Sequence, residues 1–382
     1  MKTGLAFAIL LLAALPAQAE MERAYIGTFT PSPGRGPTTG SQGEGIYLTE
    51  LDTITGKLRA PLLVAQTLSP SWLAIDRKRS LLYATNESGA GGISAFRIDK
   101  ASGDLAPIGQ VALPSPTHLA LSPDGGWLVA SSYGDPVSLV KLEPDGTPGA
   151  VVQTIRIEGT ARPSQVTEPV GNRWVTNAGK ASRMHGAFFH PDGRHVVLTE
   201  YGLDILIVYA LENGQLREVA RNPQMAGAAP RHAVWNATGA LLYTISEGDS
   251  AVTVSAFNAA TGALTQRQHI SALPPGYTGT AAAAEILLSK DGRNLYVSNR
   301  FHDSIAHFRV GAHGLLTYVN DTVTGTNMVR LLQFDPSGRY LLAGGQNNDT
   351  IASFRLGADG APQPLNLYAA APSPVILVFV GD

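Results

Sequence analysis

The feature that most constrains this chain is a twelve-residue unit, built around a tight turn, that recurs along the sequence. Five clear copies and one diverged copy span Ser122–Tyr133, His190–Tyr201, Asn236–Glu247, Ser289–Arg300, Asp335–Gln346 and Asp76–Glu87. In most copies a turn of the Pro-Asp-Gly type separates two apolar runs, a pattern typical of two antiparallel strands in a hairpin. The copies begin 46, 68, 46, 53 and 46 residues apart. No stretch of useful length shows a helical period.

Further apolar runs follow each copy, such as Ile305–Val310 and Ile351–Leu356. Four short strands in a repeat of about 40–50 residues predict one blade of a β-propeller. The runs Tyr25–Thr30 and Gly45–Glu50 resemble a blade that lacks its first strand, which Pro374–Val380 can supply. We therefore expect an all-β, seven-bladed β-propeller over residues 20–382, its ring closed by the N- and C-terminal strands. A β-sandwich is the alternative, but it does not explain six copies of one turn.

The first 19 residues have the pattern of a signal peptide. Lys2 precedes the apolar run Leu5–Leu15, and the small residues Ala17 and Ala19 suit cleavage after Ala19. The alternative is a membrane anchor, but the run is short of the roughly 20 residues that cross a bilayer. The sequence predicts a periplasmic or secreted protein with no membrane span after cleavage.

Composition excludes several classes of function. The chain has no Cys, which excludes disulfides, Cys-ligated zinc and Cys nucleophiles. Charged residues make up 15% of the chain and the net charge is −2, so no nucleic-acid partner is expected. There is no Gly-x-Ser-x-Gly motif. We expect no metal or cofactor, because metal-ligand spacing and carboxylate clustering are absent around His118, His190, His195, His302, His307 and His313.

Equivalent positions in the copies can be compared directly. The position that starts the strand before the turn holds Ser71, Thr117, His185, Arg231, Ala284 and Arg330. The position that ends the strand after the turn holds Glu87, Tyr133, Tyr201, Glu247, Arg300 and Gln346. The start and the end of a hairpin lie together, and the first strand of a blade lines the central channel. Both rings of residues are therefore predicted at one mouth of the channel.

Charged groups gather in these two rings. Three guanidiniums in one concave site favour a carboxylate or phosphate ligand, and a Glu or His beside them can act as general base or acid. A salt-bridge network that closes the channel is the alternative. His232 follows Arg231, so strand alternation predicts that it faces away from the channel and packs between blades.

The longest spacing implies an insertion between Glu158 and Gly179, which contains Arg162, Glu168, Asn172, Arg173 and Trp174. It leads into His185 and is expected beside the same mouth. It is either a substrate-contacting lid or an ordinary variable loop.

Five segments carry a resemblance to a known family. They are Tyr25-Ile-Gly-Thr-Phe-Thr30, His185-Gly-Ala-Phe-Phe-His-Pro-Asp-Gly193, Pro230-Arg-His232, Ser246-Glu247 and Ser298-Asn-Arg-Phe-His-Asp-Ser-Ile305. From about Ala24 onward the chain resembles the seven-bladed propeller lactonase family. That family includes one class of bacterial 6-phosphogluconolactonase and the fungal 3-carboxy-cis,cis-muconate lactonizing enzyme. Arg183-Met-His185 departs from the family's frequent His-x-His, and Val329 replaces a usual Pro.

The resemblance implies that His185, Arg231, Glu247 and Arg300 are catalytic. The ring positions add Arg330, Glu87, Tyr133, Tyr201 and Gln346 as substrate contacts. We expect a monomeric, metal-independent lactone hydrolase whose partner is a small anionic lactone or sugar acid, with either Glu247 or His185 as the base. The alternatives are a carboxymuconate-type cycloisomerase that uses the same site, and an exported propeller that only binds a sugar acid or a protein.

Overall fold

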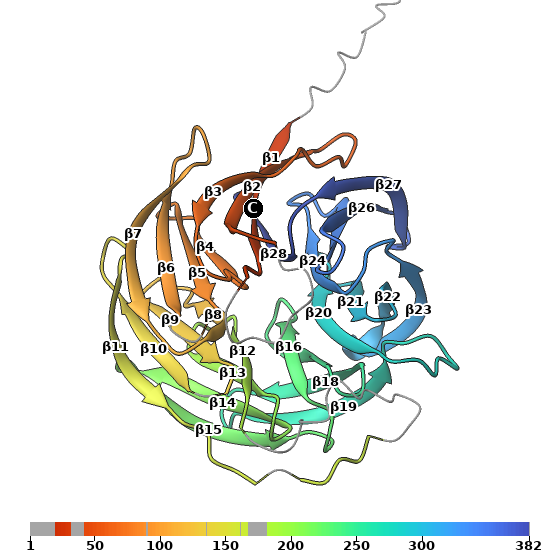
Figure 1. Cartoon of the computed structure of the whole chain (residues 1–382). Helices are drawn as coiled ribbons and strands as arrows, with labels where there is room; N and C mark the ends of the chain where they lie inside the picture. The colour runs from red at the N-terminus through yellow and green to blue at the C-terminus, as the bar shows by residue number, and fades with distance from the viewer. Residues whose placement is uncertain are drawn as a thin grey trace, which may run out of the picture.

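The chain folds into a ring of seven β-sheets around a central axis, as the computed structural model in Figure 1 shows. The structure describes residues 20–31, 42–88, 91–134, 136–160, 162–166 and 182–381, so the predicted signal peptide lies outside the described residues. Over these ranges each sheet has four antiparallel strands, and a 3₁₀ turn at Ala312–Gly314 is the one helical element. No helix of this described part is long and apolar enough to cross a bilayer. The predicted seven-bladed propeller is confirmed.

Each blade runs outward from the axis in chain order, except that the first blade takes its innermost strand from the C-terminus. The innermost strands are β28 (Pro374–Phe379), β4 (Leu73–Asp76), β8 (Pro116–Leu121), β12 (Met184–Phe189), β16 (Pro230–Trp235), β20 (Ala282–Leu288) and β24 (Val329–Phe334). The second strands are β1 (Met21–Thr28), β5 (Leu81–Asn86), β9 (Trp127–Ser132), β13 (His195–Glu200), β17 (Leu241–Ser246), β21 (Asn294–Arg300) and β25 (Tyr340–Gly345). The third strands are β2 (Gly45–Asp52), β6 (Gly92–Ile98), β10 (Val137–Leu142), β14 (Ile205–Glu212), β18 (Ala251–Asn258), β22 (Ser304–Val310) and β26 (Thr350–Leu356). The outermost strands are β3 (Leu62–Gln66), β7 (Leu105–Ala112), β11 (Pro148–Ile155), β15 (Gln215–Pro223), β19 (Ala263–Ser271), β23 (Leu316–Val323) and β27 (Pro362–Ala370).

The ring is closed by a strand from each end of the chain. β28 pairs antiparallel with β1, with Ile26 opposite Leu377 and Tyr25 opposite Val378. β28 also contacts β24 and β4, the innermost strands of its two neighbours. This closure pairs the inner edge of β1, which the first blade would otherwise leave open, as the sequence predicts.

The geometry of the hairpin turn explains why a glycine recurs at the same position of the repeat. The fourth residue of the turn has a positive φ of 69° to 72° in the copies at Gly125, Gly193, Gly239, Gly292 and Gly338. Only glycine adopts this backbone conformation at no steric cost. Apolar side chains of the central strands then fill the layers between blades; one such cluster joins Tyr243 and Val254 to Leu295 and Phe308 of the next blade.

A buried tyrosine hydroxyl also links neighbouring blades at five of the interfaces. Tyr83 in β5 donates a hydrogen bond to the carbonyl of Gly146, in the turn between β10 and β11 of the next blade. The equivalent bonds join Tyr25 to Gly103, Tyr243 to Gly314, Tyr296 to Gly360 and Tyr340 to Ile54. These bonds connect the second strand of one blade to the outer turn of the next.

Candidate active site

Four innermost strands begin with a β-bulge at the residue that the repeat comparison singles out. The pairing of β16 with β17 slips between Pro230 and His232, so Arg231 has no partner across the ladder. The ladders of β8, β12 and β24 slip in the same way at Thr117, His185 and Arg330. A bulge bends its strand and re-aims the side chain of the extra residue. The predicted residues at the strand starts therefore share one backbone geometry.

The second predicted ring is tied to the first by a recurring backbone hydrogen bond. The N–H of Glu247 donates to the carbonyl of Ala229, two residues before Arg231, at 2.9 Å. The equivalent bonds run from Glu87 to Ser69, from Tyr133 to Ser115, from Tyr201 to Arg183 and from Gln346 to Met328. Both rings therefore lie at the same end of the blades, as the hairpin argument predicts.

The centre of the candidate site is a buried cluster of Arg231, Glu247 and Arg300. Oε2 of Glu247 lies 3.2 Å from Nε of Arg231 and 2.8 Å from Nη2 of Arg300. Backbone carbonyls orient both guanidiniums, since Nη1 of Arg231 donates to Ala284 and Nε of Arg300 donates to Ala282. All three side chains are at least nine-tenths buried. The cluster joins two neighbouring blades at the channel mouth.

Glu247 is ionised despite its burial. Burial alone would raise the pKa of its carboxyl, but Arg300, Arg231 and Arg330 outweigh that effect and lower it below the ordinary value. Burial and the other two guanidiniums in turn lower the pKa of Arg231 to about 9. The two neighbouring guanidiniums are part of the cause, and an anionic ligand beside them would favour the charged form of Arg231.

Arg330 is the most exposed of the three arginines. Its guanidinium lies 5.1 Å from the ring centre of Phe29, a cation–π distance. Its charge contributes to the lowered pKa of both Arg231 and His185, so it lies within electrostatic reach of the cluster. An incoming anion would therefore meet Arg330 before the two buried arginines.

His185 lies beside the cluster and is neutral. Burial lowers the pKa of its imidazole well below the ordinary value, and Arg231, His232 and Arg330 lower it further. Its ring centre is 4.9 Å from that of His232. Its Nδ1 atom is buried and has no hydrogen-bond partner among the described residues. The imidazole therefore offers an unprotonated nitrogen at neutral pH.

Two tyrosines line the site next to His185. The hydroxyl of Tyr201 donates to Oε1 of Glu247 at 3.4 Å, and its ring is 6.2 Å from that of Tyr133. Tyr133 is 39% exposed, and Nη1 of Arg183 donates to its hydroxyl at 3.2 Å. Glu87 and Gln346 are buried at the equivalent ends of β5 and β25. The roles of these four ring residues as substrate contacts stay predictions.

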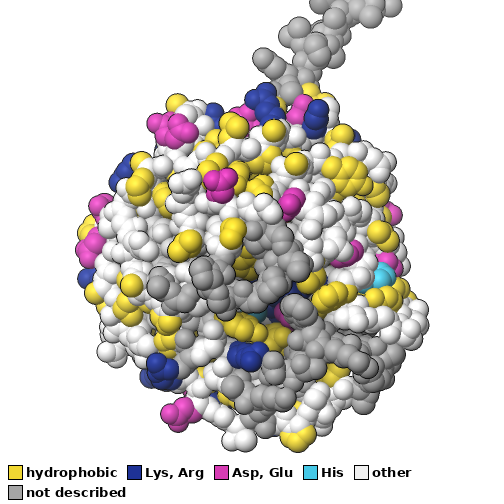
Figure 2. Space-filling view, in the orientation of Figure 1, with side chains coloured by type: hydrophobic (Ala, Val, Ile, Leu, Met, Phe, Trp, Pro, Cys, Tyr) yellow, Lys and Arg dark blue, Asp and Glu magenta, His cyan; other side chains and the backbone are white. Residues whose placement is uncertain are grey.

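The charged groups lie in a depression of the molecular surface. Figure 2 shows a hollow at the centre of the viewed face, with acidic, basic and histidine side chains at its bottom. A concave surface with charged side chains at its bottom suits a small-molecule site.

The expectation that His232 packs between blades is wrong. Its ring centre lies 5.0 Å from that of Trp72 and 5.5 Å from that of His118, which belong to two blades that do not adjoin its own. His232 therefore points into the channel. The reason is the bulge at Arg231, which breaks the strict alternation on which the prediction depended.

Sequence reasoning missed the residues that lie with His232 in the channel. His118 is sandwiched between Trp72 and Phe188, with ring centres 4.1 and 4.8 Å away. Glu285 in β20 is buried and reaches Nδ1 of His232 at 3.0 Å. The position one residue later in each repeat carries a sequence signal for these channel residues. It holds Trp72, His118, Gly186, His232, Glu285 and Leu331. Two histidines and a glutamate at one interior strand position are unusual for a core.

With this geometry in place, comparison with known proteins decides the family. A model for "Lactonase, 7-bladed beta-propeller" matches residues 23–379. The chain belongs to the seven-bladed β-propeller lactonase family. A 6-phosphogluconolactonase of Bacillus subtilis is 30% identical over 321 residues, which are 81% of this chain and 84% of the relative. A solved structure from Pseudomonas aeruginosa, named a periplasmic gluconolactonase, matches with a TM-score of 0.82 at 27% identity, over 94% of this chain and 99% of that one. The protein is thus a lactonase that acts on a small molecule.

One group of described residues in this lactonase has the donors for a metal ion, and it lies at the opposite end of its blade. His190, Asp192 and His195 place one donor atom each within 4.8 Å of one another. The expectation of no carboxylate clustering is therefore wrong for these two histidines, because the turn brings Asp192 between them. Hydrogen bonds within the turn already engage the donors: Nδ1 of His190 accepts from the N–H of Asp192, and Nδ1 of His195 bonds the Asp192 carboxylate at 2.7 Å. The group explains how the turn closes and is remote from the cluster of Arg231, Glu247 and Arg300.

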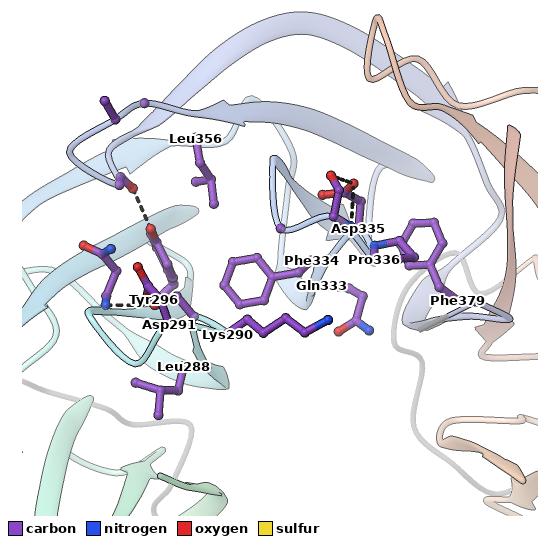
Figure 3. Close-up of a pocket in the computed structure, with 18 of the residues that line it drawn as sticks. Leu288, Lys290, Asp291, Tyr296, Gln333, Phe334, Asp335, Pro336, Leu356 and Phe379 are labelled. Atoms are coloured by element: carbon purple, nitrogen blue, oxygen red, sulfur yellow. Dashed lines mark hydrogen bonds between the residues drawn. The ribbon is translucent and has the colours of Figure 1, made fainter. Parts of the chain in front are cut away.

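A cavity of about 570 Å³ also lies at the turn end, between the blades of β20–β23 and β24–β27. Figure 3 shows Lys290 extended across it beside Gln333, with Phe334 on one wall. The acidic residues there are turn formers: Asp291 accepts from Ser289 Oγ, and Asp335 accepts from the backbone of its own turn. The charged and histidine side chains of the two predicted rings gather at the other end, and six blades contribute residues to these rings.

Part of the predicted insertion is described, and it contacts the segment that precedes β16. Nη2 of Arg162 donates to the carbonyl of Gln224 at 2.6 Å, and the N–H of Gln165 donates to Ala226 at 2.7 Å. Both carbonyls belong to the segment that leads into Arg231. Glu168, Asn172, Arg173 and Trp174 lie outside the described residues.

Proposed function

We propose that this lactonase hydrolyses an anionic lactone of the sugar-acid type, without a metal ion and outside the cytoplasm. The observation that carries the proposal is the cluster of Arg231, Arg300 and Arg330 around Glu247, with the neutral His185 beside it. A bidentate guanidinium suits a carboxylate or phosphate on the substrate. The relative from Bacillus subtilis is named for a phosphorylated lactone, which supports an anionic substrate.

In hydrolysis the lactone carbonyl gains negative charge as water attacks. The buried guanidinium of Arg231, held by Ala284 and Glu247, would stabilise that oxyanion in a site with little water. Arg330, nearer the surface, would hold the anionic substituent. Arg300 and Glu247 would keep Arg231 oriented, so that little reorganisation is needed in the transition state.

We assign the base to His185 rather than to Glu247. Glu247 contacts two guanidiniums, which stabilise its charged form and make it a weak proton acceptor. His185 is unprotonated, and the positive charges of Arg231 and Arg330 contribute to its low pKa. An anionic substrate would neutralise part of this charge, raise the pKa of His185 and so strengthen the base when the site is filled.

The same charges argue for chemistry without a metal. Three guanidiniums act on the carboxylate of Glu247, so a divalent cation would have to approach against their repulsion. We expect a chelator such as EDTA to leave the rate unchanged.

Export is supported by the signal-peptide pattern of residues 1–19. The predicted cleavage point after Ala19 stands directly before Glu20, whose carbonyl accepts from Thr53, and before β1. The Pseudomonas aeruginosa protein of similar structure is named periplasmic. N-terminal sequencing of the protein from a cell fractionation should find Glu20 in the exported fraction; a cytosolic protein that begins at Met1 would contradict this part of the proposal.

A lactone panel tests the activity. We expect the purified mature protein to hydrolyse 6-phosphogluconolactone with a higher kcat/KM than glucono-δ-lactone, measured by pH-stat. Arg330→Ala should raise KM for the phosphorylated lactone and leave the neutral one little changed. Equal values for both lactones in the wild type would exclude an anion-specific site.

A further inference from the structure

Glu285 is a buried carboxyl group that the proposed mechanism does not use. Its Oε1 and Oε2 atoms lie 3.0 and 3.1 Å from Nδ1 of His232, and Oε1 also accepts from the N–H of Ile286 at 3.0 Å. Nη1 of Arg231 lies 3.3 Å from Nε2 of the same ring, which can accept from it while Nδ1 donates to Glu285. Glu285, His232 and Arg231 therefore form a continuous polar chain that runs from the interior of the channel to the active site.

The protonation of Glu285 decides the form of His232. Burial lowers the pKa of His232 well below the ordinary value, so its ring is neutral and carries one proton. An ionised Glu285 can only accept, which fixes that proton on Nδ1. A protonated Glu285 can donate to Nδ1 instead, which moves the ring proton to Nε2. The two forms also differ by one negative charge beneath Arg231.

We infer that Glu285 and His232 are positioning residues for Arg231, and that the ionised form of Glu285 is the one that supports catalysis. The inference rests on the proposed function, because it assigns Arg231 to the oxyanion. Ionised Glu285 gives Arg231 a second counter-charge, behind the His232 ring that faces Nη1, whereas Glu247 contacts Nε. When Glu285 is neutral, the guanidinium is drawn toward Glu247 alone and away from the substrate.

The surroundings of Glu285 place the loss of its proton near neutral pH. Burial raises the pKa of its carboxyl to about 7, although Arg231, the N–H of Ile286 and Arg330 act in the opposite direction. These two cations and the neutral His232 are the charged and titratable groups that face it from β16 and β24. Activity should therefore rise with pH through about 7 as Glu285 loses its proton.

The test is the pH–rate profile of Glu285→Gln, whose amide mimics the protonated acid. We expect kcat about tenfold below the wild type at pH 8, with little change in KM, and no rise of kcat between pH 6 and 8. If Glu285→Gln keeps the wild-type rise, the inference is wrong. If the wild type hydrolyses no lactone, the proposed function fails first.

Glu200→Gln is a matched control. Glu200 is also buried, with its pKa raised by burial to about 7, but it accepts from the backbone of Arg183 and Leu203 and has no contact with the chain of Glu285, His232 and Arg231 among the described hydrogen bonds. A buried acid with a raised pKa stabilises the fold below its unfolded pKa and loses that contribution as pH rises through its folded pKa. The Tm of each variant relative to the wild type should therefore increase from pH 5 to pH 8. Only Glu285→Gln should lose the rise of kcat; loss of the rise in both variants would overturn the inference.

Discussion

At the scale of single residues, the site depends on opposite charges in contact. Arg231 and Glu247 are both buried, and each is the counter-ion of the other. We expect Arg231→Ala and Glu247→Gln each to lower kcat by about 10²-fold or more, because the first removes the oxyanion partner and the second releases two guanidiniums. The measurement is kcat on the best lactone of the panel.

Circular dichroism supplies the folding control for these two variants. The mouth adds little to the apolar layers between blades, so both variants should keep the wild-type spectrum. Full activity in both would show that lactone hydrolysis does not depend on this cluster.

The structure changes the effect on kcat that we expect from substituting His232. A position that faces away from the channel would tolerate His232→Gln, but the ring contacts both Glu285 and Arg231. We therefore expect His232→Gln to lower kcat about tenfold. His190→Gln is the comparison, since it removes a buried histidine from the opposite end of its blade. It should lower Tm and leave kcat unchanged, and an equal loss of kcat in both variants would point to general destabilisation instead.

At the scale of strands, hairpins were predictable and bulges were not. The turn glycines and the apolar runs specify where each hairpin begins and ends, which is why Glu247 and Arg300 could be placed at one end. A bulge depends on how a strand start packs against its neighbours, and no residue type marks it reliably. His232 and Glu285 were missed for this reason, since alternation without a bulge turns them out of the channel.

Thr199 in β13 holds two of these bulges together. Its buried hydroxyl accepts from the N–H of Gly186 at 2.8 Å and donates to the carbonyl of Arg231 at 2.7 Å. Thr199→Val keeps the shape but leaves both backbone groups without this partner, which should cost about 1–3 kcal/mol of unfolding free energy. It should also lower kcat, because both bulges carry site residues.

Thr49→Val is the control that separates the effect of a lost threonine hydrogen bond on stability from its effect on kcat. Thr49 is a buried threonine of β2 that donates to the carbonyl of Arg59 at 2.7 Å, in a different blade. It should reduce the free energy of unfolding, measured in urea, without changing kcat. If Thr199→Val also left kcat unchanged, the bulge geometry would not matter for the reaction.

At the scale of the whole molecule, the chain relies on a closed ring rather than on separate blades. The pairing of β28 with β1 could be predicted from the sequence, because the first blade lacked a strand and the C-terminal run supplied one. The tyrosine bonds between blades could not, because each joins a strand to a turn of the next repeat, and sequence spacing does not show how blades are rotated against each other. Together they make the blades depend on their neighbours on both sides.

The last prediction tests this dependence. Tyr83→Phe removes a buried hydroxyl and leaves the carbonyl of Gly146 without this donor, which should cost about 1–3 kcal/mol; Tyr296→Phe does the same to Gly360 in a distant blade. In a ring that unfolds as one unit, each variant lowers the midpoint of a single urea transition, and the two costs add in the double variant to within about 0.5 kcal/mol because the sites share no partner. Tyr368→Phe, at a side chain that is 54% exposed, should leave the midpoint unchanged. Blades that unfold independently would instead split the transition, and each variant would then shift only the part that contains its own blade.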